Sequence, residues 1–156
     1  WTKGKTALLG DAAHATVPFY GQGMNASFED CTVLYELMLK HNENWQAVFK
    51  EYQETRKKDG DAIQDLSLHN YYVMRDYVGD PMFLLQKKIE AKLMAKYPEK
   101  WMPLYSQVTF SNIPYSTAWE VGQKQDAIMK KVMDKPTIND IWDSEEIERE
   151  ILSLIS

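Results

Sequence analysis

The stretch from Gly10 to Asn25, GDAAHATVPFYGQGMN, constrains this chain more than any other. It follows Lys5–Leu9, a run that is continuously apolar after its first residues, as is typical of a strand buried on both faces. A loop with one proline and two glycines comes next, and an amphipathic helix begins after it. This order brings the carboxylate of Asp11 and several free backbone amides to the same space. We therefore expect a ligand site here, suited to a polyhydroxylated, phosphorylated molecule.

The rest of the chain predicts helices. Apolar residues recur at helical spacing over residues 23–39, 45–78, 81–97, 116–133 and a last segment that begins near Asp143. Prolines interrupt residues 101–114, which we expect to be irregular with one short extended piece. The fold class predicted is mainly α, with four to five helices and one amino-terminal strand. Because a lone strand lacks ladder partners, the rest of its sheet is expected outside this sequence.

Composition excludes several functional classes. The net charge is -5 and lysines are scattered among acids, so no basic face for nucleic acid is expected. The single cysteine, Cys31, excludes an internal disulfide, fits a reducing compartment and lies on an apolar helix stripe, where we expect it in the core. No apolar run approaches the ~20 residues that cross a bilayer. A soluble, cytoplasmic protein is predicted.

The segment Gly21–Ala26, GQGMNA, matches the alanine variant of the dinucleotide-binding fingerprint only weakly. That fingerprint follows directly on a strand, whereas about ten loop residues intervene here. The reading as an ADP-binding turn is therefore rejected. Glycines just before a helix still leave its first amides free for an anion or a carbonyl oxygen, although an ordinary loop with a helix start explains the spacing equally well.

Three polar residues allow two readings each. Asp11 follows a predicted strand, so it accepts hydrogen bonds from ligand hydroxyls or caps the next turn. His14 suggests acid–base chemistry, but no ligand spacing for a metal surrounds it, and a structural loop histidine is favoured. Asn70 lies on the apolar stripe of the long helix, where its amide must bond neighbouring backbone or a polar ligand group.

A resemblance to a known family rests on a long run of spaced residues. Leu8–His14, Pro18, Gly21–Asn25 and Glu29–Asp30 together resemble the second FAD motif of the flavoprotein aromatic hydroxylases. Within that family the chain is similar to the branch that hydroxylates L-kynurenine. The segments that carry this closer resemblance are Pro18–Asn25, Asp65–Ser67, Asn70–Tyr71, Met74–Arg75, Pro103–Tyr105 and Val108–Ser111. It covers about residues 5–130, and the tail beyond Pro136 matches nothing usable.

The resemblance implies a flavin chemistry and a set of site residues. NADPH would reduce FAD, and a C4a-hydroperoxide of the flavin would hydroxylate L-kynurenine at ring position 3. Asp11 would bind a hydroxyl of the ribityl chain, and the helix start would face the pyrophosphate and the C2 carbonyl of the flavin. The cofactor-binding residues implied are Gly10, Asp11, Gly21, Gln22, Gly23, Met24 and Asn25. Pro18, Phe19 and Tyr20 would line the active site, Asn70 and Tyr105 would bind the substrate, and no residue is assigned a certain catalytic role.

The chain departs from the family pattern in what it lacks. The glycine-rich ADP turn and the arginine expected to clamp the substrate carboxylate have no counterpart here. We therefore expect a carboxyl-terminal fragment of a bacterial-type enzyme that is inactive and binds FAD weakly or not at all by itself. Its expected parts are a remnant of the FAD-binding domain (1–40), a helical region on the substrate side (41–135) and an acidic amphipathic tail helix (136–156). The alternative is a non-catalytic interaction or scaffold domain; self-association through the exposed strand and apolar helix faces is also expected.

Overall fold

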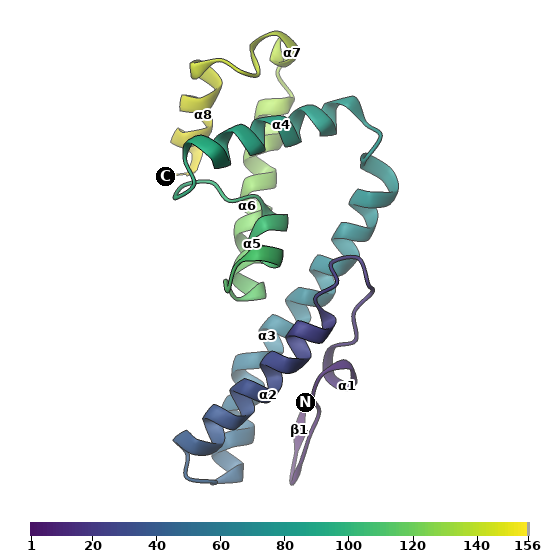
Figure 1. The fold of residues 1–156 in the computed structure, drawn as a ribbon, viewed down its shortest axis with the longest axis vertical. Helices are drawn as coiled ribbons and strands as arrows, with labels where there is room; N and C mark the ends of the chain where they lie inside the picture. Colours follow the sequence, from purple (N-terminus) through teal and green to yellow (C-terminus); the bar gives the residue numbers. More distant parts are fainter. Residues whose placement is uncertain (156) are drawn as a thin grey trace. The chain divides into compact units, whose positions relative to one another are not determined.

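A computed structural model describes residues 1–155 of the chain. The described chain forms two compact units: unit 1 holds Trp1–Tyr72 with Pro114–Ser116, and unit 2 holds Val73–Ile113 with the residues from Thr117 onward. Over these residues there are eight α-helices, one π-helical turn and one two-stranded sheet (Figure 1). The mainly α fold is confirmed, with more helices than the four to five expected. No helix in this part of the chain is both long and apolar enough to cross a membrane.

The amino-terminal strand of unit 1 differs from the prediction. β1 (Thr2–Lys3) and β2 (Thr6–Ala7) form an antiparallel hairpin in which Thr2 lies opposite Ala7. The expectation of a lone strand over Lys5–Leu9, buried on both faces, is wrong: Thr6 is exposed, and so is Leu8 at 42%. The reason is Gly4, whose φ of 60° suits glycine and lets the preceding residues fold back as a partner strand.

Two long helices form the body of unit 1. α2 (Gly23–Lys40) and α3 (Trp45–Tyr72) lie side by side (Figure 1). Their shared core consists of Leu37, Val48 and Tyr52, with Trp1, Leu9, Val33, Leu34 and Phe49 packed against it. The Tyr52 hydroxyl donates to the carbonyl oxygen of Leu8 at 3.3 Å. The packing therefore joins the hairpin end to both helices.

The apolar stripe expected to be buried on α2 is only partly so. Phe28 is 65% exposed and Tyr35 58%, and Cys31 is exposed rather than in the core. The face that meets α3 instead carries Ala26, Asp30 and Leu37. The apolar surface of α2 is therefore wider than the part that α3 covers. The covered part has a charged residue, Asp30, between Ala26 and Leu37.

Unit 2 contains the remaining elements. η1 (Val73–Tyr77) continues directly from α3, so the long helix expected over 45–78 is confirmed with a π-helical last turn. The other elements are α4 (Pro81–Lys96), α5 (Leu104–Phe110), α6 (Tyr115–Met133, whose first two residues belong to unit 1), α7 (Ile138–Ile141) and α8 (Glu145–Ile155). Asp80 caps α4, accepting from the amides of Met82 and Phe83. The core of unit 2 consists of Ile89, Leu93, Trp101, Met129, Val132, Ile138, Ile147 and Ile151.

The expectation for residues 101–114 is wrong. Residues 104–110 form helix α5 rather than an extended piece, because burial of Gln107 and Val108 overrides the β preference of the segment. The last helix, expected to begin near Asp143, begins at Glu145, and the amide of Ile147 donates to the Ser144 hydroxyl. α6 begins at Tyr115, one residue before the expected start at 116.

The acid response of unit 2 should depend on Glu148. This carboxylate is 5% exposed, and hydrogen bonds from Lys92 and Lys96 lower its pKa to about 2. The stabilisation is present above the ordinary pKa of 4.5 and is lost as the pH falls through about 2. Glu148→Gln should therefore lower the free energy of unfolding at pH 7, and its deficit against wild type should shrink between pH 4.5 and pH 2.

Urea unfolding followed by circular dichroism over this pH range measures the deficit. The matched control is Glu145→Gln, since Glu145 lies on the same helix with its side chain 79% exposed. A deficit for Glu148→Gln that does not change with pH would contradict the expected role.

Candidate functional site

A buried carboxylate, Asp30, lies at the centre of unit 1. Its side chain is 0% exposed and accepts three hydrogen bonds: from the Gly10 amide at 2.9 Å, from His14 Nε2 at 2.6 Å and from Arg56 Nε at 2.8 Å. Burial acts to raise the pKa of Asp30, but the hydrogen bonds from Arg56, Gly10 and His14 outweigh it and lower the pKa. Asp30 is therefore an ionised, fully engaged acceptor.

Arg56, on α3, is the counter-charge. Its side chain is 3% exposed and also lies 3.0 Å from Glu29 and 3.5 Å from Asp59. Its Nη2 donates to the carbonyl oxygen of Ala26 at 3.4 Å. One guanidinium thus faces three carboxylates and one carbonyl, so both helices are aligned around it.

His14 has a structural place in this cluster. It is 1% exposed, and its Nε2 faces the Asp30 carboxylate, which identifies Nε2 as the nitrogen that carries the proton. Its Nδ1 is buried without a hydrogen-bond partner in the described residues. The Trp1 ring packs beside His14, with the two ring centroids 5.5 Å apart. His14 lies in helix α1 rather than in a loop, and its favoured structural role stays a prediction.

The bond from Gly10 to Asp30 fixes a corner in the backbone. Gly10 has a φ of 56°, and a Cβ atom there would lie 2.9 Å from the Ser27 hydroxyl oxygen. Its carbonyl accepts from the amides of Ala13 and His14, which starts the short helix α1 (Asp11–His14). Asp11 is the first residue after the corner and is exposed. A buried ion pair thus determines where an exposed carboxylate is presented.

The glycine loop, residues 21–25, leads into α2. Gly21 has a φ of 68°, and no side chain caps the amides at the start of the helix. A Cβ atom at Gly23 would lie 3.0 Å from Thr16 Oγ1, so the loop approaches the preceding segment closely. The Gln22 side-chain oxygen accepts from Asn25 Nδ2 at 2.9 Å, and this bond holds the Gln22 side chain against the loop. The arrangement presents a helix amino terminus beside Asp11.

A hollow of about 450 Å³ brings these parts together. It is lined by Asp11, Thr16, Pro18, Gly21, Gly23, Met24 and Ser27. Four of the seven predicted cofactor-binding residues, and Pro18 of the predicted active-site lining, therefore share one space. Of the others, Gly10 and Gln22 are buried behind it and Asn25 is exposed.

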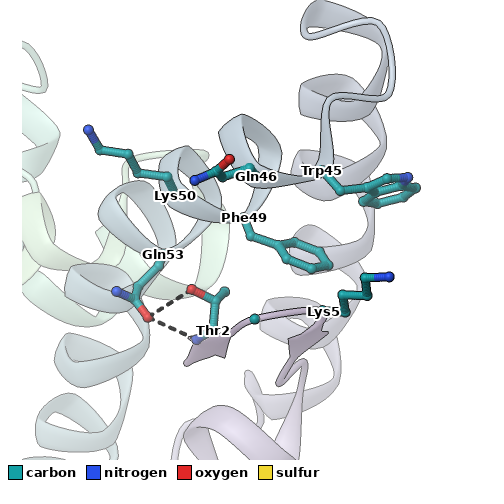
Figure 2. A pocket seen from close by; sticks show the side chains of 8 residues that line it. Thr2, Lys5, Trp45, Gln46, Phe49, Lys50 and Gln53 are labelled. Carbon is teal, nitrogen blue, oxygen red and sulfur yellow. Dashed lines mark hydrogen bonds between the residues drawn. The ribbon is translucent and has the colours of Figure 1, made fainter.

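A second hollow, of about 900 Å³, lies between the hairpin and the start of α3 (Figure 2). It is lined by Thr2, Gly4, Lys5, Trp45, Gln46, Phe49, Lys50 and Gln53. Gln53 is already engaged there, since its side-chain oxygen accepts from the Thr2 amide at 2.9 Å. Although larger, this hollow contains none of the predicted residues, and the helix start beside it is capped, since Asn44 Oδ1 accepts from the Ala47 amide at 3.4 Å; the smaller hollow is therefore the candidate site.

The predicted substrate residues are placed within their own units. In unit 1, Asn70 is 9% exposed and donates to the carbonyl oxygen of Phe19 at 2.7 Å, which confirms the backbone contact considered for it. The Phe19 ring lies 4.7 Å from that of Tyr71, and Tyr20 is 7% exposed. In unit 2, Tyr105 is 51% exposed. Asn70 thus holds the segment on which the predicted active-site lining lies.

Sequence reasoning missed the roles of Asp30, Arg56 and Asp59. The position of Arg56 could have indicated these roles, because it shares a helical face with Val48 and Tyr52, both 0% exposed. An arginine at such a position is rarely buried unless it is paired, so its phase predicts a buried carboxylate partner.

Comparisons with known proteins show which family this chain resembles. The family described as FAD binding domain matches residues 1–67. Kynurenine 3-monooxygenases of Flavobacterium psychrophilum and Flavobacterium johnsoniae are 50% and 51% identical, over 100% and 99% of this chain. That of Candida albicans is 45% identical over 85% of the chain. The chain spans only 35% of the length of the two bacterial relatives and 29% of the yeast one.

Removing the charge of Asp30 should destabilise unit 1. Asp30→Asn leaves Arg56 buried without its main partner, which typically costs about 3–5 kcal/mol. Because the pKa of Asp30 is lowered, its stabilisation is present above the ordinary value of 3.8 and is lost as the pH falls through the folded value. The deficit of the variant should therefore narrow below pH 3.8.

Urea unfolding at pH 7 and at pH 3 measures this change. Asp61→Asn is the control, since Asp61 lies on α3 but is paired with Lys57 at the surface, with a side chain 53% exposed. Equal stability of the two variants at pH 7 would refute the assigned role of Asp30.

Proposed function

The chain belongs to the family of the kynurenine 3-monooxygenases, with which it shares about half its residues over its whole length, and on this premise we propose that it supplies the carboxyl-terminal part of an FAD-dependent monooxygenase. The proposed reaction is hydroxylation of L-kynurenine to 3-hydroxykynurenine, with NADPH as the reductant. Bound FAD would supply the activation of oxygen that this reaction needs. The observation that carries the proposal is the hollow where Asp11 and the uncapped start of α2 meet.

The residues of this hollow fit part of a flavin. An exposed carboxylate at Asp11 can accept hydrogen bonds from the hydroxyl groups of a ribityl chain. The free amides at the start of α2 favour a pyrophosphate oxygen or the flavin C2 carbonyl, and they stabilise the negative charge that a reduced flavin carries near that carbonyl. A side chain at Gly23 would crowd the Thr16 hydroxyl, and glycine there leaves the loop backbone open to a ligand.

The proposed substrate side depends on two further groups. Pro18 lines the hollow, and Phe19 and Tyr20 follow it directly, so this segment would border the flavin ring on the side where the substrate binds. Asn70 supports the segment through its bond to Phe19. Asn70 and Tyr105 are proposed to bind the amino-acid end of the substrate, as the resemblance implies.

The chain by itself is proposed to be inactive and to bind FAD weakly or not at all. Nothing in the described residues offers a second glycine-rich turn for the ADP half of the cofactor, so the contacts to that half would be missing. A cytoplasmic location remains part of the proposal.

A second candidate function is an interaction domain without flavin chemistry. The observation that favours it is the exposed apolar face of α2, where Met24, Phe28, Tyr35 and Leu39 are each more than half exposed. Such a face invites association, including self-association. The hollow beside Asp11 favours the enzyme, because a scaffold does not require a carboxylate and free amides at one place.

A chimera separates the two candidates. The chain replaces the matching segment of the Flavobacterium johnsoniae kynurenine 3-monooxygenase, to which it is 51% identical. The enzyme proposal predicts a yellow protein in which L-kynurenine stimulates NADPH oxidation and 3-hydroxykynurenine accumulates. A folded but colourless chimera would support the interaction domain instead.

Asp11→Asn in the same chimera tests the site itself. Loss of a hydrogen bond to a charged acceptor should weaken FAD binding about tenfold or more, measured by quenching of flavin fluorescence. Glu36→Gln is the matched control, because Glu36 is an exposed carboxylate on α2 outside the hollow. Unchanged affinity in Asp11→Asn would remove Asp11 from the flavin site.

A further inference from the structure

The ion pair of Asp30 and Arg56 continues to a segment far away in sequence. Arg56 Nη1 lies 3.5 Å from Asp59 Oδ2, and Asp59 is 5% exposed. Asp59 Oδ1 accepts from the amide of Ser116 at 3.0 Å and from its hydroxyl at 2.5 Å. The turn of residues 115–116, which belongs to unit 1, is thus fixed by a carboxylate on α3.

The residue before Ser116 reaches the glycine loop. Tyr115 is 9% exposed, and its hydroxyl donates to the side-chain oxygen of Gln22 at 3.4 Å, across 93 positions of the sequence. The same oxygen of Gln22 accepts from Asn25 Nδ2 at 2.9 Å. The hydroxyl of Tyr115 therefore contacts the group that orients the loop at the start of α2.

We propose that the turn of residues 115–116 is a positioning element for the glycine loop. Asp59 fixes the turn, and Tyr115 transmits its position to Gln22. Together with the bond from Asp30 to Gly10, one buried arginine then holds both walls of the candidate site: the Gly10 corner through Asp30, and the glycine loop through Asp59 and Tyr115. This positioning role adds to the proposed function, and its consequence for flavin binding depends on that proposal.

The chemistry of the contacts supports a positioning role over simple packing. Burying Arg56 with Asp30 and Asp59 carries a desolvation cost that apolar residues of the same size would avoid. Charged hydrogen bonds are, however, directional, and each oxygen of Asp30 and Asp59 is committed to a specific donor or cation. Such a set defines where backbone groups lie, which is what a site made largely of backbone amides requires.

The variants differ in which link they remove. Tyr115→Phe removes one hydroxyl and keeps the buried ring, so the fold is retained. Asp59→Asn loosens the turn itself. Tyr35→Phe is the matched control, since Tyr35 is 58% exposed on α2.

Amide hydrogen exchange of the isotopically labelled 156-residue chain, followed by NMR, is the test, and it involves no flavin. Asp59→Asn should raise the exchange rate of the Ser116 amide about tenfold or more. Both Asp59→Asn and Tyr115→Phe should shift the amide resonances of residues 23–25 in the same direction, whereas Tyr35→Phe should leave them in place. The double variant should shift them no further than Tyr115→Phe alone, because both changes act through one hydroxyl.

The proposal is overturned if Tyr115→Phe leaves the resonances of residues 23–25 unchanged, or if Asp59→Asn frees Ser116 without moving them. In the flavin-binding chimera, Tyr115→Phe should weaken FAD binding at least threefold while Tyr35→Phe does not. If the exchange results hold and the chimera binds no flavin, the positioning role stands and the flavin assignment fails.

Discussion

Unit 1 depends on one buried charge pair, the carboxylate of Asp30 on α2 and the guanidinium of Arg56 on α3. Both are almost fully removed from water, so neither is tolerated without the other. Their contact sets how α2 and α3 face one another. It also determines the path of residues 10–14, because Gly10 and His14 donate to the same carboxylate. Helix packing and the shape of the candidate site thus share a single cause.

The buried contacts also bear on the polar groups at the surface of the candidate site. Asp11 and the amides at the start of α2 need no partners of their own to be held in place, because the residues beside them are fixed from within. Free amides and an unpaired carboxylate remain available for a ligand. A site of this kind is preorganised by buried contacts and offers its polar groups without rearrangement.

Much of the helical content could be predicted from the sequence, since proline, glycine and cap positions mark the ends of α2, α3, α4 and α6. The hairpin could not, because a positive φ at Gly4 creates a partner strand that a buried-strand pattern does not announce. The helix over residues 104–110 was missed because its β-branched residues are helical only through burial of Gln107 and Val108. Local preference decides a segment only where tertiary packing does not.

The residues that line the candidate site could be predicted from the sequence, whereas the buried contacts that hold them could not. The glycines and Asp11 form a motif within one short stretch of sequence, residues 10–25. The supporting pairs join residues 26, 57 and 93 positions apart, from Asp30 to Arg56, from Asp59 to Ser116 and from Gln22 to Tyr115. A single sequence carries no direct record of such contacts, although an arginine on a buried helical face indicates that one exists.

A crystal structure of the chimera grown with FAD tests the central claim most directly. The account predicts that the Asp11 carboxylate contacts a ribityl hydroxyl and that the amides at the start of α2 face the pyrophosphate or the C2 carbonyl, with Gly10 still bonded to Asp30. Flavin bound elsewhere, for example in the hollow between the hairpin and Trp45, would contradict it.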